Sequence, residues 1–218
     1  TRQSFFKDSM LIQRSVTDKA VEKLDSIKDA LLKEYPSYTN LDRLDSMRSS
    51  INRGTSPDIV MHYYTTCIFR LHTLDGAPIV NNKFLAPVFD DLAAENILNE
   101  MVTYLEIMNS NFYNALYNKH NNILMLFGLQ GVHDVYKSYE KEFSVKAPPQ
   151  YVARYKAIRD STELRPTISY IDSVYKKYKF DFSISADDWW RQSVAASSHL
   201  KVMRNDLMAN AQMEMTKI

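Results

Sequence analysis

The sequence predicts an all-α protein, a bundle of long helices joined by short connections. Only four of its 218 residues are glycine. In most of the chain, apolar residues recur every three or four positions, which is the period of an amphipathic helix. With 45% hydrophobic residues, a chain of this length can bury a sizeable core. We therefore expect helices packed against helices.

The first predicted helix spans residues 2–34 and has one apolar seam. Pro36 ends it, because proline cannot continue a helix. Two seam positions, Gln13 and Thr17, are polar, and buried polar side chains need partners. These two side chains would bond to a neighbouring helix, which is the commoner case, or face a ligand. The seam consists of Phe6, Met10, Gln13, Thr17, Ala20, Leu24, Ile27 and Leu31.

Two helices are expected next, a short one at residues 41–51 and a longer one at residues 56–73. Gly54 is a natural left-handed stop between them. Ser56 can cap the longer helix, and Pro57 suits its first position. Its apolar residues form two adjacent rows, which is a wider stripe than a surface helix needs. We therefore expect the longer helix to be the centre of the bundle. The rows are Ile59, Tyr63 and Cys67, and Val60, Tyr64, Ile68 and Leu71.

The middle of the chain predicts a long helix at residues 87–119 and further helices after it. Residues 109–122 are rich in asparagine and can contain a break. The run 124–129 is apolar enough to belong to the core, and helical spacing resumes over residues 132–143. Two adjacent prolines, Pro148 and Pro149, then break the chain before shorter helices at residues 151–160 and 162–179.

The last predicted helix begins after Ser185, a capping residue, with two acidic residues in its first turn. Trp189 and Trp190 are expected to anchor it. Its three/four spacing continues almost to the end of the chain. With helical patterns at both ends, we expect the segment to be excised from a longer protein that signals through its terminal helices. The spaced residues are Ala196, Leu200, Met203, Leu207, Ala211 and Met215.

Composition and motif searches exclude several classes of function. The formal net charge of +1 and the lack of a basic cluster give no reason to expect nucleic acid as a partner. The single cysteine, Cys67, excludes an internal disulfide framework. No phosphate loop, zinc motif or nucleophile elbow is present, so we expect no cofactor, no metal and no enzymatic activity in this segment. No apolar stretch reaches the roughly 18 residues of a membrane span, so any membrane contact would come through flanking segments.

One group of polar residues is a candidate ligand site. Lys201 and Arg204 lie one turn apart, flanking the apolar seam of the last helix. Two cations beside a buried seam could hold a small anion between helices. Arg14, next to Gln13, and Arg70 are further cations that could point the same way. The alternative is that these residues form a basic edge exposed to solvent. Spacing alone does not show that they lie close together.

Four stretches together resemble NIT domains, the helical nitrate- and nitrite-sensing modules of receptors. They correspond to the family's first-helix signature, its Tyr-Thr helix, its break before a proline and its closing tryptophan helix. The stretches are Gln13-Arg14-x-x-Thr17-Asp18-x-Ala20, residues 56–65, residues 139–148, and Asp187-Asp188-Trp189-Trp190 with Leu200-Lys201. This chain lacks the arginine that often follows the glutamate of the family's middle helix, which is Glu106 here.

The resemblance implies an elongated helical bundle of two packed four-helix-type bundles that share long helices. Residues 1–218 would then be a single sensor domain, extracellular or periplasmic (a cytoplasmic place stays open), ahead of a cyclase, kinase or chemotaxis module. We expect a nitrate- or nitrite-like anion, or another small polar ligand, to bind near five residues, and the domain to form a homodimer. The alternative is a helical dimerisation scaffold without a pocket. The five residues are Gln13, Arg14, Thr17, Lys201 and Arg204.

Overall fold

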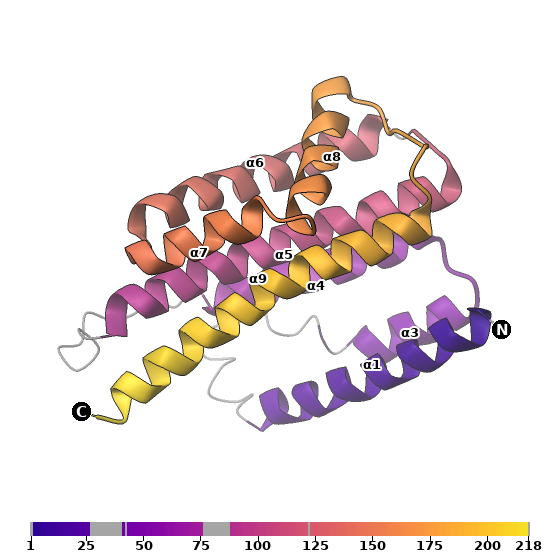
Figure 1. Cartoon of the computed structure of the whole chain (residues 1–218). Coiled ribbons are helices and arrows are strands. Elements are labelled where there is room, and N and C mark those ends of the chain that lie inside the picture. The colour runs from indigo at the N-terminus through magenta and orange to yellow at the C-terminus, as the bar shows by residue number, and fades with distance from the viewer. Residues whose placement is uncertain (1, 27–40, 42, 76–87, 122, 218) are drawn as a thin grey trace. The chain divides into compact units, whose positions relative to one another are not determined.

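A computed structural model describes the chain except for residues 1, 27–40, 42, 76–87, 122 and 218. The described residues form helices and no strand, so the all-α prediction is confirmed. The chain divides into two compact units, Thr1–Gly76 and Ala77–Ile218, which we describe separately. Whether they are the two expected sub-bundles of a single domain stays a prediction. The helices, labelled in Figure 1, are α1 (Arg2–Asp25), α3 (Leu44–Asn52), α4 (Pro57–Asp75), α5 (Phe89–Asn118), α6 (Ile123–Lys146), α7 (Pro149–Arg159), α8 (Leu164–Lys177) and α9 (Ala186–Met215).

In the first unit, α3 and α4 are joined by a tight turn at the predicted glycine. Gly54 has a φ of +86°, a left-handed conformation in which glycine meets no steric penalty. Around it, the amide of Thr55 donates to the carbonyl of Ser50 at 3.2 Å, and the amide of Gly54 donates to Ile51 at 3.0 Å. These two bonds satisfy carbonyl groups at the end of α3, as in a Schellman motif.

The more buried face of α1 differs from the predicted seam. Met10, Gln13 and Ala20 are exposed, whereas the half-buried side chains are Arg14, Thr17, Val21 and Leu24. The reason is a contact with α3. Arg48 pairs with Asp18 at 2.5 Å and donates to the carbonyl of Arg14 at 3.4 Å, so that face of α1 turns toward α3. Seam positions Ile27 and Leu31 lie outside the described residues.

Helix α4 forms as predicted, but its two apolar rows are less buried than expected for a helix at the centre of the bundle. Cys67 is buried, and Tyr63, Tyr64 and Ile68 are half-buried. Ile59, at the start of one of the two predicted apolar rows, is 57% exposed. Most of the described core residues lie in the second unit instead, above all on α5.

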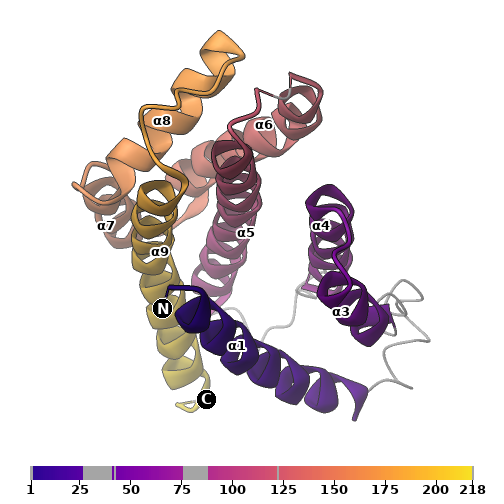
Figure 2. The same ribbon diagram turned by 90° about the vertical axis from the view of Figure 1, so that its right-hand side faces the viewer.

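The second unit is a bundle in which α5 lies between α6 and α9. Helix α9 runs alongside α5 over most of its length, and α6 packs on another side of α5 (Figures 1 and 2). The short helices α7 and α8 pack against each other and against α9. They separate at Ser161, whose hydroxyl accepts a hydrogen bond from the amide of Leu164 at 3.2 Å and so starts α8.

Helix α5 is continuous through its asparagine-rich segment, so the predicted break at residues 109–122 falls only at the very end. Amide side chains bond within the helix: Asn111 donates to the carbonyl of Ile107 at 2.8 Å, and Asn118 donates to Asn114 at 2.9 Å. The chain turns at Lys119, where φ is +50°. The apolar run that follows is only partly core, because Leu126 is fully buried but Leu124 is 82% exposed.

Helix α9 begins as predicted, and most of its predicted apolar positions are buried. The Ser185 hydroxyl accepts from the amide of Asp188 at 3.1 Å, which caps the first turn. Trp189 is fully buried, and its Nε1–H donates to the carbonyl of Asn109 on α5 at 2.9 Å. Trp190 is 40% exposed, so Trp189 alone anchors the helix in the core. The seam is fully buried at Ala196, Leu200, Met203, Leu207 and Ala211, whereas Met215 is exposed.

Candidate functional site

The two predicted cations of α9 lie at its contact with α5. Lys201 forms an ion pair with Glu106. Arg204 donates from Nη1 to the amide oxygen of Asn99 at 2.8 Å and from Nη2 to Asn205 at 3.2 Å. The charge of Lys201 is therefore balanced by a carboxylate, whereas these two partners of Arg204 are neutral amides. Arg204 is consequently the better suited of the two to attract an anion.

The three candidate residues of α1 belong to the first unit. Gln13 is exposed, and Arg14 and Thr17 are half-buried. The Thr17 hydroxyl donates to the carbonyl of Gln13 at 2.9 Å, a bond within the helix. Whether these residues share one site with Lys201 and Arg204 stays a prediction. The side chain of Arg70, the further candidate cation, lies outside the described part of the chain.

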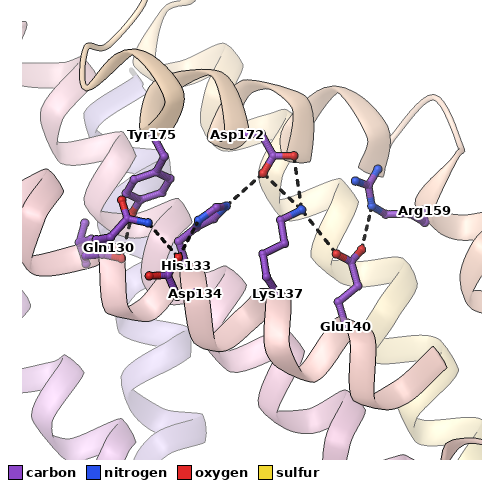
Figure 3. A network of polar contacts seen from close by, with 9 residues as sticks. Gln130, His133, Asp134, Lys137, Glu140, Arg159, Asp172 and Tyr175 are labelled. Carbon is purple, nitrogen blue, oxygen red and sulfur yellow. Dashed lines mark hydrogen bonds and ion pairs between the residues drawn. The ribbon is translucent and has the colours of Figure 1, made fainter. Parts of the chain in front are cut away.

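A polar network that the sequence analysis did not predict joins α6 to α7 and α8 (Figure 3). Four polar residues of α6 recur at three- and four-residue steps, which places them on one face of the helix. Three of them, His133, Lys137 and Glu140, contact partners 15 to 39 residues further along the chain, whereas Gln130 donates to Asp134 on its own helix at 2.9 Å. That polar row was the available sequence signal, but the row alone does not identify its partners. The four residues are Gln130, His133, Lys137 and Glu140.

At one end of this network, Glu140 accepts hydrogen bonds from two residues of α7. The Tyr155 hydroxyl lies 2.6 Å from Glu140 Oε1, and Arg159 Nε lies 2.9 Å from the same oxygen. Lys137 Nζ is 3.4 Å from the other oxygen. Burial opposes ionisation of Glu140, but the Tyr155 bond and the two cations outweigh it and lower its pKa. Burial, with the nearby Tyr136 and Glu140, raises the pKa of Tyr155.

At the other end, Asp172 of α8 contacts two residues of α6. His133 Nε2 lies 3.0 Å from Asp172 Oδ1, and Lys137 Nζ lies 3.3 Å from the same oxygen. Although burial opposes it, these contacts lower the pKa of Asp172. The His133 ring stacks on Tyr175 with centroids 4.5 Å apart, and the Tyr175 hydroxyl donates to the carbonyl of Leu129 at 3.2 Å.

This network is suited to holding helices together. Lys137 contacts both Glu140 and Asp172, and the lowered pKa values of these two carboxyl groups keep them ionised near neutral pH. A general acid at that pH needs a raised pKa. In the described part of the chain, no three His, Cys, Asp or Glu side chains are placed to hold a metal ion. We therefore assign the network a structural role, as the link that holds α7 and α8 on α6.

None of the described helices is both long enough and apolar enough to cross a membrane.

A comparison with protein families identifies the class. The model of the NIT family, described as nitrate and nitrite sensing, matches residues 1–212. The chain therefore belongs to the NIT family of sensory domains, and the resemblance to NIT domains noted in the sequence is confirmed. A receptor and signalling role follows from that membership. No curated protein and no solved structure matches the chain.

Proposed function

We propose that this chain is the non-enzymatic ligand-binding domain of a signalling receptor and that its ligand is nitrate, nitrite or a related small anion. The observation that carries the proposal is the family match, which extends over residues 1–212. It favours a sensor over a scaffold that lacks a small-molecule site.

Among the candidate residues, we propose Arg204 as the principal anion contact. Arg204 is half-buried, and its hydrogen bonds to the neutral amides of Asn99 and Asn205 leave its guanidinium with a full positive charge. A planar guanidinium can also donate two parallel hydrogen bonds to two oxygens of a planar anion. Lys201 would assist, although an anion there must compete with Glu106.

Arg14, Gln13 and Thr17 are proposed as contributors from α1. Arg14 supplies charge, and the exposed amide of Gln13 supplies an N–H donor. Thr17 is the weakest candidate of the three. Nitrate only accepts hydrogen bonds, and the Thr17 proton already bonds the carbonyl of Gln13.

Thermal denaturation with sodium nitrate or sodium nitrite, against sodium chloride at equal ionic strength, tests the proposal. At 100 times the dissociation constant a ligand stabilises the folded state by about 2.7 kcal/mol. For a chain of this size that corresponds to roughly 5–10 °C. Equal melting temperatures in all three salts would refute anion sensing.

Variants then test the site. We expect Arg204→Gln to remove most of the nitrate-specific shift and Arg14→Gln to reduce it. Arg154→Gln is the matched control, because Arg154 also reaches α9, through Asp206 at 2.6 Å, but is not a candidate ligand residue. An unchanged shift in Arg204→Gln, or an equal loss in Arg154→Gln, would overturn the assignment of Arg204.

We further propose that anion binding changes how α9 packs on α5 and that α9 relays this change. An anion on Arg204 would compete with Asn99, one of the polar contacts between the two helices. Ligands that couple two sites in this way typically do so with about 1–3 kcal/mol. Hydrogen exchange should therefore change in α9 more than in α7 when nitrate binds, and equal changes would contradict the relay.

The remaining expectations are proposals that follow from the family's sensory role. We propose that the domain is extracellular or periplasmic, attached to a membrane by flanking segments, and that it acts as a homodimer. Measured mass against concentration tests the dimer, and a monomer at every concentration would refute it. Protease accessibility of the domain in intact cells that carry the receptor tests its location.

A further inference from the structure

One end of the second unit carries a protruding group of apolar side chains. They come from the start of α6 and the end of α8, and the rings of Phe127 and Tyr178 lie 5.3 Å apart, which joins the two sets. The exposed fractions are 48% for Ile123, 82% for Leu124, 58% for Phe127 and 41% for Tyr178. We call these four residues the apolar tip. On the same helix, Leu126 and Leu129 are buried in the unit. The core of the unit therefore uses those two side chains and leaves Leu124 and Phe127 exposed.

Lysines flank the residues of the apolar tip in the sequence, and acids are scarce there. From residue 113 to residue 131 the sequence has Lys119 and no aspartate or glutamate. Around Tyr178, three lysines occur within two residues on either side, and Asp181 is the nearest acid in sequence. All four lysines are exposed. The apolar tip therefore has a positively charged rim, made by Lys119, Lys176, Lys177 and Lys179.

From this arrangement we infer that the apolar tip contacts the surface of an anionic lipid bilayer. Protruding Leu and Phe side chains enter the boundary between headgroups and acyl chains, and tyrosine favours the headgroup level. Lysines beside them attract anionic headgroups. A second copy of the chain fits less well, because a symmetric contact would bring the lysine rims of both copies together.

The inference does not rest on anion sensing. Helix α9 starts after the connection that follows Tyr178 and extends for 30 residues, or about 45 Å. If a segment after α9 attaches the chain to a membrane, as proposed above, the apolar tip can reach the same bilayer when the second unit lies along the membrane surface.

Co-sedimentation with vesicles tests the inference on the full chain. The probes are phosphatidylcholine vesicles with and without phosphatidylglycerol, at low and high salt. We expect binding to the anionic vesicles that weakens at high salt. Leu124→Ser should weaken binding about tenfold, and Lys176→Gln about fivefold. Val145→Ser is the matched control, since Val145 is 77% exposed near the other end of α6.

Each outcome decides the inference. Binding that is weakened about tenfold in Leu124→Ser and unchanged in Val145→Ser supports it. The inference is overturned by a lack of binding to anionic vesicles, by equal binding of all variants, or by binding that ignores phosphatidylglycerol. Self-association of the wild-type chain that Leu124→Ser abolishes would assign the tip to a second copy and also overturn it. Circular dichroism confirms that each variant is folded, which is expected for such exposed positions.

Discussion

Replacing Glu140 with glutamine is expected to lower the free energy of unfolding of the second unit by about 1–2 kcal/mol at neutral pH. The Glu140 side chain is 19% exposed and contacts Tyr155, Arg159 and Lys137. Removing one partner of a fully buried ion pair costs about 3–5 kcal/mol, whereas an exposed pair contributes at most about 1 kcal/mol. This network lies between those limits, because Arg159 is 26% and Lys137 34% exposed.

The loss should depend on pH with a defined sign. The folded-state pKa of Glu140 is lowered, so its stabilising contribution is present above the pKa of the unfolded chain, about 4.3. It disappears as the pH falls through the lower folded-state pKa. Wild type and Glu140→Gln are therefore expected to differ near neutral pH and to converge in acid. Asp172, whose pKa is also lowered, titrates in both proteins and largely cancels in the difference.

Thermal denaturation followed by circular dichroism, from acid to neutral pH, measures this difference. Each kcal/mol corresponds to about 2–4 °C in a protein of this size. Glu142→Gln is the control, because Glu142 pairs with Lys146 on its own helix at 2.6 Å, a contact typically worth under about 0.5 kcal/mol. If Glu140→Gln were as stable as Glu142→Gln, or if the difference grew toward acid pH, the role assigned to the network would be wrong.

Four further substitutions test a core contact, a helix cap and a turn. Trp189→Phe should cost about 2–4 kcal/mol in urea unfolding, because it leaves a cavity and removes the buried hydrogen bond from the indole to the carbonyl of Asn109. Trp190→Phe should cost under about 1 kcal/mol, because Trp190 is 40% exposed. Ser185→Ala removes the cap of α9 and should cost about 1 kcal/mol in the same assay; no change would contradict the cap. Gly54→Ala places a side chain at a φ of +86° and should cost about 1 kcal/mol, seen as faster hydrogen exchange in α3 and α4 but not in α9.

Helices whose signals are local in sequence could be predicted well. The start of α9 followed from Ser185 and the acids after it, and its buried face followed from the spacing, except that the last predicted position, Met215, is exposed. The end of α3 followed from Gly54. In each case the residues that decide the structure lie within one helix or one turn, where period and capping chemistry are sufficient evidence.

Features that depend on distant partners could not be predicted. The pairing of His133 with Asp172 joins residues 39 positions apart, and the contact of Arg48 with Asp18 joins residues 30 apart. Local periodicity does not show which polar row of one helix contacts which polar row of another helix. For the same reason the sequence did not predict that Arg14 and Val21 would be half-buried on α1, on the side where Arg48 contacts Arg14 and Asp18.

The candidate site combines a feature that the sequence predicts with contacts that it does not predict. The position of Lys201 and Arg204 beside the α9 seam could be inferred from spacing alone. Their partners on α5 lie about a hundred residues earlier in the chain and become neighbours only because α5 and α9 pack together. That packing is what distinguishes the carboxylate-paired Lys201 from the amide-bonded Arg204.

The most direct test of the central claim is a calorimetric titration of the purified domain with sodium nitrate, with sodium chloride titrated as the reference. We expect saturable heat with nitrate and none with chloride. In Arg204→Gln, the heat with nitrate should be strongly reduced. Identical dilution heats for both salts, with the protein shown to be folded, would contradict it.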